Sequence, residues 1–404
     1  MADNEINETK EAKVSDQELC YENDELICGH LGDEYEKFQG AVIPPIYQTS
    51  LHVHPTVEEM WDPQPGRFVY ARVANPTTDI FERKVAALER AERAVAFGSG
   101  MGAITAAILA TVKVGGHFVG IESMYGPART FVEDFLPRIG VEYTFVTGND
   151  LQEIKQAIRP NTQCIYLESP SSIALRLQDL RAIATFAKDK GIPTIIDNSW
   201  ASPIFQKPLT MGIDMVVHTC SKYIGGHSDI VAGVACGSNE WMTKVAKNRE
   251  IYGSVLGPFE SWLAIRGLRT LPIRVKASMQ NGLKVASFLE EHPMVERVIY
   301  PGLPSHPDHH LATSQLTGYG SLMSFIPRGS IEEIKAFANR LNWFKLGVSW
   351  GGFESLIVVN RFNPTADEVE RRSIPARLVR IYVGLEDTDI LIDDLDKSLK
   401  QIKL

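Results

Sequence analysis

Continuous apolar runs separated by helical segments are the sequence feature that most constrains the fold of this chain. The runs are Ala94–Phe97, Phe118–Ile121, Val141–Val146, Gln163–Leu167, Pro193–Ile196 and Met215–His218. The helical segments between them include Gly126–Leu136, Leu151–Ile158 and Leu180–Lys190. Strands that are apolar throughout are typical of a parallel sheet covered by helices on both faces. We therefore expect an α/β fold with a mostly parallel central sheet.

The pattern changes after about residue 271. Helical segments become longer, and the apolar runs Val295–Tyr300, Leu322–Ile326 and Val379–Val383 are fewer. This predicts an α/β domain over residues 75–270, followed by a smaller C-terminal α+β domain over residues 271–404. Residues 1–74 are expected to form a polar N-terminal arm, to about residue 24, and then an irregular segment rich in proline and glycine.

Charge and cysteine content limit the partners. With 41 Lys+Arg against 50 Asp+Glu, the net charge is −9, which argues against binding of nucleic acid or an anionic membrane. No apolar run is long enough to span a membrane. Five cysteines without a CxxC pair predict reduced thiols, and the polar start lacks the features of a signal peptide, so we expect a cytoplasmic protein.

Two charged residues follow strands at the edge where α/β proteins bind ligands. Asp197 comes directly after the run Pro193–Ile196, and Lys222 follows Met215–His218 by a few residues. Ligands of open α/β sheets collect at the carboxyl ends of the strands. A buried charge needs a partner or a ligand, although either residue alone is also consistent with an ordinary surface charge or salt bridge.

The glycine-rich segment Gly98–Gly102 lies between an apolar run and an Ala/Ile-rich helical segment. Free N–H groups at the start of a helix can bind an anion, although such a segment is often only a tight turn. It has neither the Walker lysine nor the G-x-G-x-x-G spacing of nucleotide-binding motifs. One phosphate site, one lysine and one strand-end aspartate are together what pyridoxal 5'-phosphate (PLP) requires. The sequence therefore predicts a PLP-dependent enzyme.

These residues are part of a longer series of motifs. From about residue 40 to residue 404 the chain resembles the Cys/Met-metabolism family of PLP enzymes, which includes cystathionine β-lyase, cystathionine γ-lyase, cystathionine γ-synthase, methionine γ-lyase and the O-acylhomoserine sulfhydrylases. The resemblance implies the aminotransferase-like α/β fold called fold type I. The motifs that carry it are Tyr70-Ala-Arg72 with Asn75-Pro-Thr77, Gly98–Met101, Tyr125-Gly126, Asp197-Asn198-Ser199, Ser221-Lys222-Tyr223 with Gly226–Asp229, Ser349–Ser355, and Arg380 with Val383–Glu386.

The resemblance also implies a role for each catalytic residue. Lys222 would form the internal aldimine with PLP and later move the Cα proton, Asp197 would pair with the ring nitrogen, and Tyr125 would stack on the ring. Arg380, with Ser349 and Trp350 beside it, would bind the carboxylate of a sulfur-containing amino acid, because a guanidinium can grip a carboxylate through two hydrogen bonds. No metal is expected, since His227 and Asp229 lack the further ligands of a tetrahedral set.

The phosphate group of PLP would be held from two subunits. The backbone N–H groups of Gly100 and Met101 and the hydroxyls of Thr219 and Ser221 would come from one chain. Members of the family supply a tyrosine and an arginine, matched here by Tyr70 and Arg72, from the neighbouring subunit. The resemblance therefore implies a homo-oligomer, usually a tetramer built from dimers with shared active sites.

The residues around Ser349 bear on which bond is cleaved. The γ-cleaving members of the family carry an acidic residue before this serine and a leucine after it, whereas this chain has Val348 and Trp350. The tryptophan form resembles a bacterial cystathionine β-lyase group, although Trp350 is also consistent with a packing residue. We expect β-elimination of cystathionine or a related cysteine S-conjugate to pyruvate, ammonia and a thiol. The alternatives are a γ-eliminating or γ-replacing enzyme and, remotely, a non-catalytic homologue.

Overall fold

A seven-stranded sheet forms the centre of the larger part of the protein. The computed structural model describes residues 22–64, 66–360, 374 and 377–403. The strand order is β1-β7-β6-β5-β4-β2-β3, with bounds β1 Arg93–Phe97, β2 His117–Ile121, β3 Glu142–Val146, β4 Thr162–Glu168, β5 Thr194–Asp197, β6 Met215–Thr219 and β7 Gly233–Gly237. β7 is antiparallel to both neighbours, and the other neighbouring strands are parallel. The expected mostly parallel sheet is thus confirmed, with β7 as a strand that the sequence pattern did not predict.

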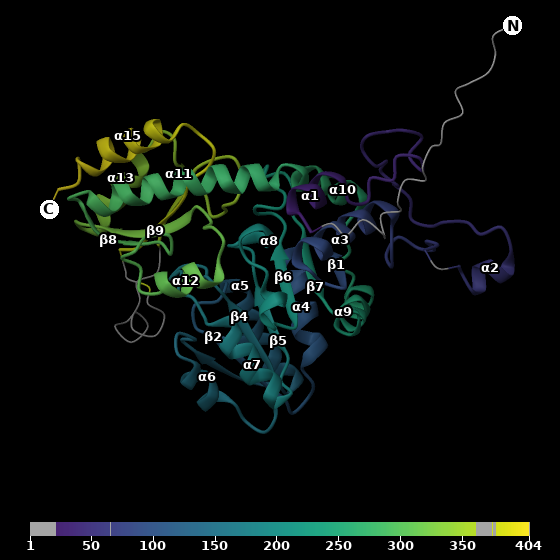
Figure 1. The fold of residues 1–404 in the computed structure, drawn as a ribbon. Coiled ribbons are helices and arrows are strands. Elements are labelled where there is room, and N and C mark those ends of the chain that lie inside the picture. The colour runs from purple at the N-terminus through teal and green to yellow at the C-terminus, as the bar shows by residue number, and fades with distance from the viewer. Residues whose placement is uncertain (1–21, 65, 361–373, 375–376, 404) are drawn as a thin grey trace, which may run out of the picture.

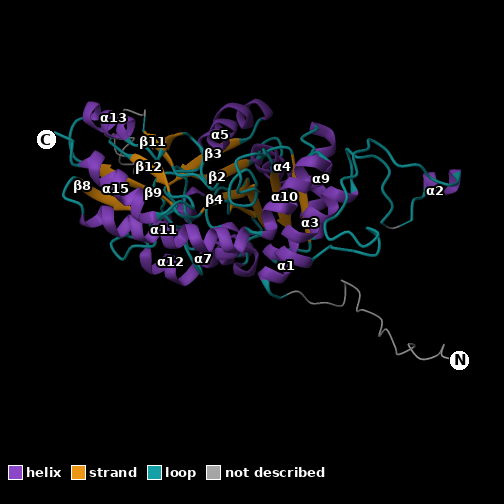
Figure 2. Cartoon of the chain, turned by 90° about the horizontal axis from the view of Figure 1, so that it is seen from above, coloured by secondary structure: helices purple, strands orange, loops and turns teal. Residues whose placement is uncertain are grey.

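Helices cover both faces of this sheet, as predicted. In Figure 2, α5 and α7 lie on opposite sides of the strands. The chain sets the helix ends locally: Ser99 caps the start of α4 by accepting a hydrogen bond from the N–H of Gly102 at 3.0 Å, and Gly191 ends α7 in the left-handed region, as is common. The helices are α3 Pro76–Glu89, α4 Gly100–Thr111, α6 Leu151–Ala157, α7 Leu180–Lys190, α8 Ser202–Phe205, α9 Asn239–Tyr252 and α10 Pro258–Arg269, with a 3₁₀ turn at Pro208–Met211.

The helix predicted over residues 126–136 is divided into three pieces. It consists of α5 Gly126–Thr130, a π-helical turn Phe131–Phe135 and a 3₁₀ turn Leu136–Ile139. Pro137 has no N–H group to continue an α-helical hydrogen-bond ladder. The chain therefore leaves α-helical geometry before this proline.

A second sheet of five strands carries most of the C-terminal part. Its order is β10-β11-β12-β9-β8, and its neighbours are antiparallel except β10 and β11. Figure 1 shows α11 running along this sheet back towards α1 and α10. The boundary at residue 271 stays a prediction, although α11 begins there. The elements are α11 Leu271–Glu291, β8 Val295–Ile299, α12 His309–Gln315, β9 Leu322–Pro327, α13 Ile331–Arg340, β10 Lys345–Leu346, β11 Leu356–Val359, β12 Val379–Tyr382 and α15 Thr388–Leu399.

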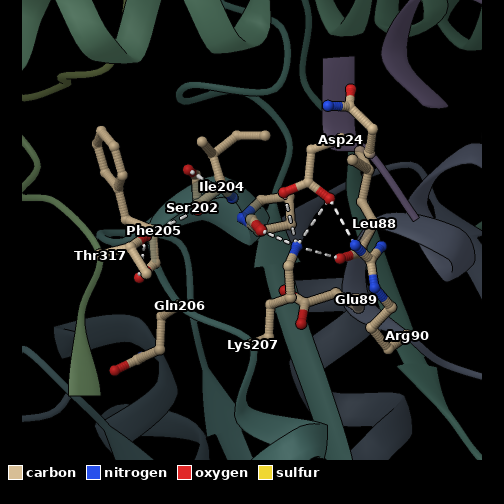
Figure 3. Close-up of polar contacts among 12 residues, drawn as sticks. Asp24, Leu88, Glu89, Arg90, Ser202, Ile204, Phe205, Gln206, Lys207 and Thr317 are labelled. Atoms are coloured by element: carbon tan, nitrogen blue, oxygen red, sulfur yellow. Dashed lines mark hydrogen bonds and ion pairs between the residues drawn. The ribbon is translucent and has the colours of Figure 1, made fainter. Parts of the chain in front are cut away.

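The N-terminal helix α1, Asp24–His30, is fixed by a cluster of charges to the end of α3 and to the loop after α8. Lys207 Nζ donates to the carbonyl of Leu88 at 2.7 Å and lies 2.9 Å from an oxygen of Asp24. Arg90 binds the same carboxylate at 3.0 Å. Figure 3 shows these contacts converging. The predicted polar arm lies largely in residues 1–21, outside the described residues.

The predicted irregular segment before residue 75 contains one short helix, α2 Val57–Trp61. Figure 1 shows α2 at the end of a long loop that stands away from both sheets. Apolar side chains along this loop are exposed, among them Val53 at 82% and Trp61 at 77%.

Candidate active site

Lys222 lies in the turn after β6, with its amine held inside the protein. Its Nζ donates to Ser349 Oγ at 2.8 Å and lies 5.3 Å from the ring centre of Trp350. Burial lowers the pKa of Lys222 to about 8, with the charge of Arg380 acting in the same direction and that of Asp197 against it. The amine is therefore half deprotonated at about pH 8, where an ordinary lysine amine is almost fully charged, as suits a nucleophile or base.

The loop that carries Ser349 approaches Lys222 closely because residue 351 is glycine. Gly351 has a φ of +87°, and a Cβ at this position would lie 2.9 Å from Lys222 Cα and 2.8 Å from the backbone nitrogen of Tyr223. Tyr223 in turn packs edge-on against Trp350, with ring centres 5.6 Å apart. Residues that are 127 positions apart in the sequence are thus held side by side.

Asp197 ends β5, the strand next to β6. Its Oδ1 accepts a hydrogen bond from the N–H of Ser199 at 2.9 Å, and only 7% of the residue is exposed. Burial raises the pKa of Asp197, while the donors of Ser199 and the charges of His218 and Lys222 oppose that rise. Ser199 Oγ also accepts from the N–H of Thr219 at 2.7 Å, which ties the carboxyl ends of the two strands together.

The start of α4 meets the end of β6 at the predicted phosphate site. The first N–H groups of a helix have no acceptor within it, which leaves those of Gly100 and Met101 for a ligand. A Cβ on Gly100 would lie 2.2 Å from Thr219 Oγ1, so only glycine lets this hydroxyl approach the helix start. Ser221 Oγ accepts from the N–H of Ala232 at 3.2 Å. The donors expected from the sequence thus come from adjoining segments.

Tyr125 is the N-cap residue of α5, and its backbone is held by a residue that the sequence analysis did not identify. Its backbone N–H donates to Glu168 Oε2 at 2.7 Å. Burial raises the pKa of Tyr125, and the charges of Asp197 and Glu168 add to the rise while Arg380 opposes it. Glu168 is an acid at the end of an apolar run, as Asp197 is, and that shared pattern was the available signal.

Arg380, on β12, reaches the same site from the second sheet. Its Nη2 donates to the carbonyl of Val348 at 2.7 Å, next to Ser349. Burial lowers the pKa of Arg380, and Arg380 in turn acts on the pKa of both Lys222 and Tyr125. A half-buried cation at this point is suited to a carboxylate ligand.

Tyr70 and Arg72 are not brought to Lys222 within one chain. Arg72 lies over the ring of Tyr70, 5.7 Å from its centre, and donates to the carbonyl of Glu250 in α9 at 2.8 Å. For the described residues, the polar and ring contacts of these two side chains include none with Lys222, Asp197 or Tyr125. Tyr70 is 45% exposed, so it is available to a neighbouring molecule.

The remaining candidates behave as ordinary structural groups. Cys220 is buried, and burial raises the pKa of its thiol above the usual range, so it is not a reactive thiolate. Where the chain is described, three or more His, Cys, Asp or Glu side chains do not gather in a form that could hold a metal ion. In the same part of the chain we find no helix with the length and apolarity needed to cross a membrane.

Comparison with known proteins agrees with this site. Residues 27–400 match the family described as Cys/Met metabolism PLP-dependent enzyme. This chain belongs to that family. Its cofactor is therefore pyridoxal 5'-phosphate. The donors described above fit the phosphate of this group, since the close contact between Gly100 and Thr219, which a Cβ would prevent, brings the helix start and the hydroxyl together.

The relatives of this Cys/Met metabolism enzyme are lyases and synthases of sulfur amino acids. It is 41% identical over 379 residues to a cystathionine gamma-lyase of Bacillus subtilis, covering 93% of this chain and 97% of that protein. It is 38% identical to an L-methionine gamma-lyase of Fusobacterium nucleatum (90% and 94% covered) and 37% identical to a chloroplastic cystathionine beta-lyase of Arabidopsis thaliana (93% and 80% covered). The prediction of a PLP-dependent lyase of cysteine and methionine metabolism is confirmed, but its β-lyase subtype is not.

Proposed function

We propose that this enzyme cleaves a carbon–sulfur bond of cystathionine or a related sulfur-containing amino acid. The observation that carries the proposal is the half-buried amine of Lys222, 2.8 Å from Ser349 Oγ and in electrostatic contact with Arg380 and Asp197. This arrangement links one amine, one carboxylate and one guanidinium by electrostatic interaction. Bound PLP supplies the electron sink that makes loss of a proton from the substrate Cα possible.

Each residue has one task in this proposal. Lys222 binds PLP and moves the Cα proton, because its lowered pKa makes the neutral amine available at about pH 8 and above. Asp197 provides negative charge to the cofactor ring nitrogen, and Arg380 binds the substrate carboxylate. Ser349 holds Lys222 Nζ in place by hydrogen bonding. Gly100, Met101, Thr219 and Ser221 bind the phosphate, and Tyr125 covers the ring.

We propose γ-cleavage as the main reaction, in place of the β-cleavage expected from the sequence. The relatives at 41% and 38% identity carry the names cystathionine gamma-lyase and L-methionine gamma-lyase. β-Elimination remains the second candidate, supported by Val348 and Trp350 and by the 37% identity to a cystathionine beta-lyase. Val348 has an apolar side chain and so offers no carboxylate at this point to bind a distal ammonium group.

Incubation with cystathionine and identification of the keto acid test both candidates. 2-Oxobutyrate with cysteine supports γ-elimination, and pyruvate with homocysteine supports β-elimination. A second incubation with methionine and with O-acylhomoserine distinguishes a methionine-cleaving or replacing enzyme. Absence of any keto acid from these substrates and from S-alkyl cysteine or cystine, by protein that has taken up PLP, would contradict the proposed lyase activity.

We further propose that Tyr70 and Arg72 complete the phosphate site of a second copy of this chain, in a tetramer built from dimers. Their separation from Lys222 and the exposed apolar loop around α2 support this arrangement. Mixing Arg72→Ala subunits with Lys222→Ala subunits should restore part of the activity, because a hybrid dimer contains one intact site. Absence of rescue in hybrids shown to have formed would place the complete site within a single chain.

A further inference from the structure

Glu168 is a buried carboxyl group that the proposed mechanism does not use. It ends β4, directly opposite Asp197 on β5 in the parallel register, and only 5% of the residue is exposed. Two neighbouring carboxyl groups removed from water do not both ionise readily, because like charges repel strongly in such surroundings. The pair therefore has to divide one negative charge and one proton between its members near neutral pH.

The surroundings of the two carboxyl groups are unequal. Asp197 accepts from the N–H of Ser199 at 2.9 Å, and the hydrogen bonds of Ser199 oppose the rise in its pKa that burial causes. The titratable groups facing Glu168 are Asp197, Tyr125 and, from its own strand, Tyr166. Burial and the charge of Asp197 raise the pKa of Glu168 well above its ordinary value, against nearby donors of Ser172 and Tyr125. The proton is therefore favoured on Glu168.

Glu168 also determines where the backbone of Tyr125 lies. Its Oε2 accepts the N–H of Tyr125 at 2.7 Å, where α5 begins. The side chain of Tyr125 makes no capping hydrogen bond to this helix, and 41% of the residue is exposed. A fixed backbone at this residue is what keeps the ring in position to cover the cofactor.

We propose that Glu168 is a positioning residue for the cofactor, which in its neutral form anchors Tyr125 through the backbone N–H and leaves the negative charge of the carboxyl pair on Asp197. The proposal deepens the proposed function, since it rests on PLP being bound between Tyr125 and Asp197. It requires a hydrogen-bond acceptor at Glu168 and no charge there. Glutamine meets both requirements. Alanine is uncharged, but it supplies no acceptor and fills less of the space that Glu168 occupies.

Infrared difference spectroscopy of the holoenzyme tests the protonation state directly. The carbonyl stretch of a protonated carboxyl group should be present in the wild type at neutral pH, absent in Glu168→Gln and retained in Asp197→Asn. A wild-type spectrum without this band, or a band that survives in Glu168→Gln, would overturn the proposal. The readout needs no substrate, so it can fail while the carbon–sulfur lyase activity stands, and the keto-acid assay can fail while Glu168 keeps its proton.

PLP affinity and the visible absorption spectrum test the positioning role. Glu168→Gln should keep the PLP affinity within about twofold of the wild type and leave the absorption spectrum unchanged. Glu168→Ala should lose at least about tenfold in PLP affinity, equivalent to about 1.4 kcal/mol. Thermal unfolding of the apoproteins serves as the control for folding. A loss in Glu168→Gln as large as that in Asp197→Asn would show that Glu168 carries charge, and unchanged affinity in Glu168→Ala would show that it does not position the site.

Discussion

Replacing Gly351 by alanine should disturb the catalytic lysine from outside the cofactor site. The new Cβ would lie 2.9 Å from Lys222 Cα and 2.8 Å from the nitrogen of Tyr223. Both are backbone atoms, which cannot turn away as the end of a flexible side chain does. Either the turn after β6 or the loop that carries Ser349 therefore has to move, and the hydrogen bond between Ser349 Oγ and Lys222 Nζ depends on both.

The expected magnitude has two parts. A non-glycine residue in the left-handed region costs about 1–2 kcal/mol, and Gly351 has a φ of +87°. Overpacking adds ~1–3 kcal/mol. Gly191→Ala is the matched control, because Gly191 has a φ of +67° and nothing within 4 Å of its added Cβ. The difference between the two variants isolates the contact with Lys222, so Gly351→Ala should be less stable than Gly191→Ala by ~1–3 kcal/mol.

Activity should separate the two variants further. A displacement of a catalytic group by roughly 1 Å can cost about 10²-fold in rate, so kcat/KM should fall by about that factor in Gly351→Ala and stay near wild type in Gly191→Ala. Denaturant unfolding and steady-state turnover on the substrate identified by the keto-acid assay measure the two effects. Equal stability and equal turnover of the two variants would refute the view that residue 351 controls the approach of Ser349 to Lys222.

The charged residues of the site lead to further predictions. Burial lowers the pKa of Lys222 to about 8, so the fraction of neutral amine grows as the pH rises through that value. The apoprotein should therefore capture PLP faster at pH 9 than at pH 7. A capture rate independent of pH, measured by stopped-flow absorbance, would contradict this. Asp197→Asn should lower turnover by more than about tenfold, or about 1.4 kcal/mol of barrier, without unfolding the protein, and a smaller loss would exclude pairing with the ring nitrogen. Arg380→Ala should raise KM far more than it weakens PLP binding in a fluorescence titration, and equal losses would assign Arg380 to the phosphate or to the fold.

Local patterns were sufficient for most of the larger sheet. Apolar runs of four or five residues between helical segments located β2, β4, β5 and β6 to within one or two residues, because strands covered on both faces must be apolar throughout. β7, Gly233–Gly237, escaped the pattern because two of its five residues are glycine, and glycine weakens any strand signal. The motifs around Lys222 and Asp197 were sufficient to predict the cofactor, because PLP needs those residue types whatever their surroundings.

The tertiary structure decided how these residues act together. The sequence placed Lys222, Ser349 and Arg380 in three separate motifs, and only the docking of the second sheet brings Ser349 Oγ to 2.8 Å from the lysine amine. Strand pairing set Glu168 opposite Asp197, which no spacing along the chain records. Chemistry at one residue can be read from its type and neighbours in sequence, whereas pKa values, shared protons and backbone approach depend on distances between segments, and these exist only once the chain has folded.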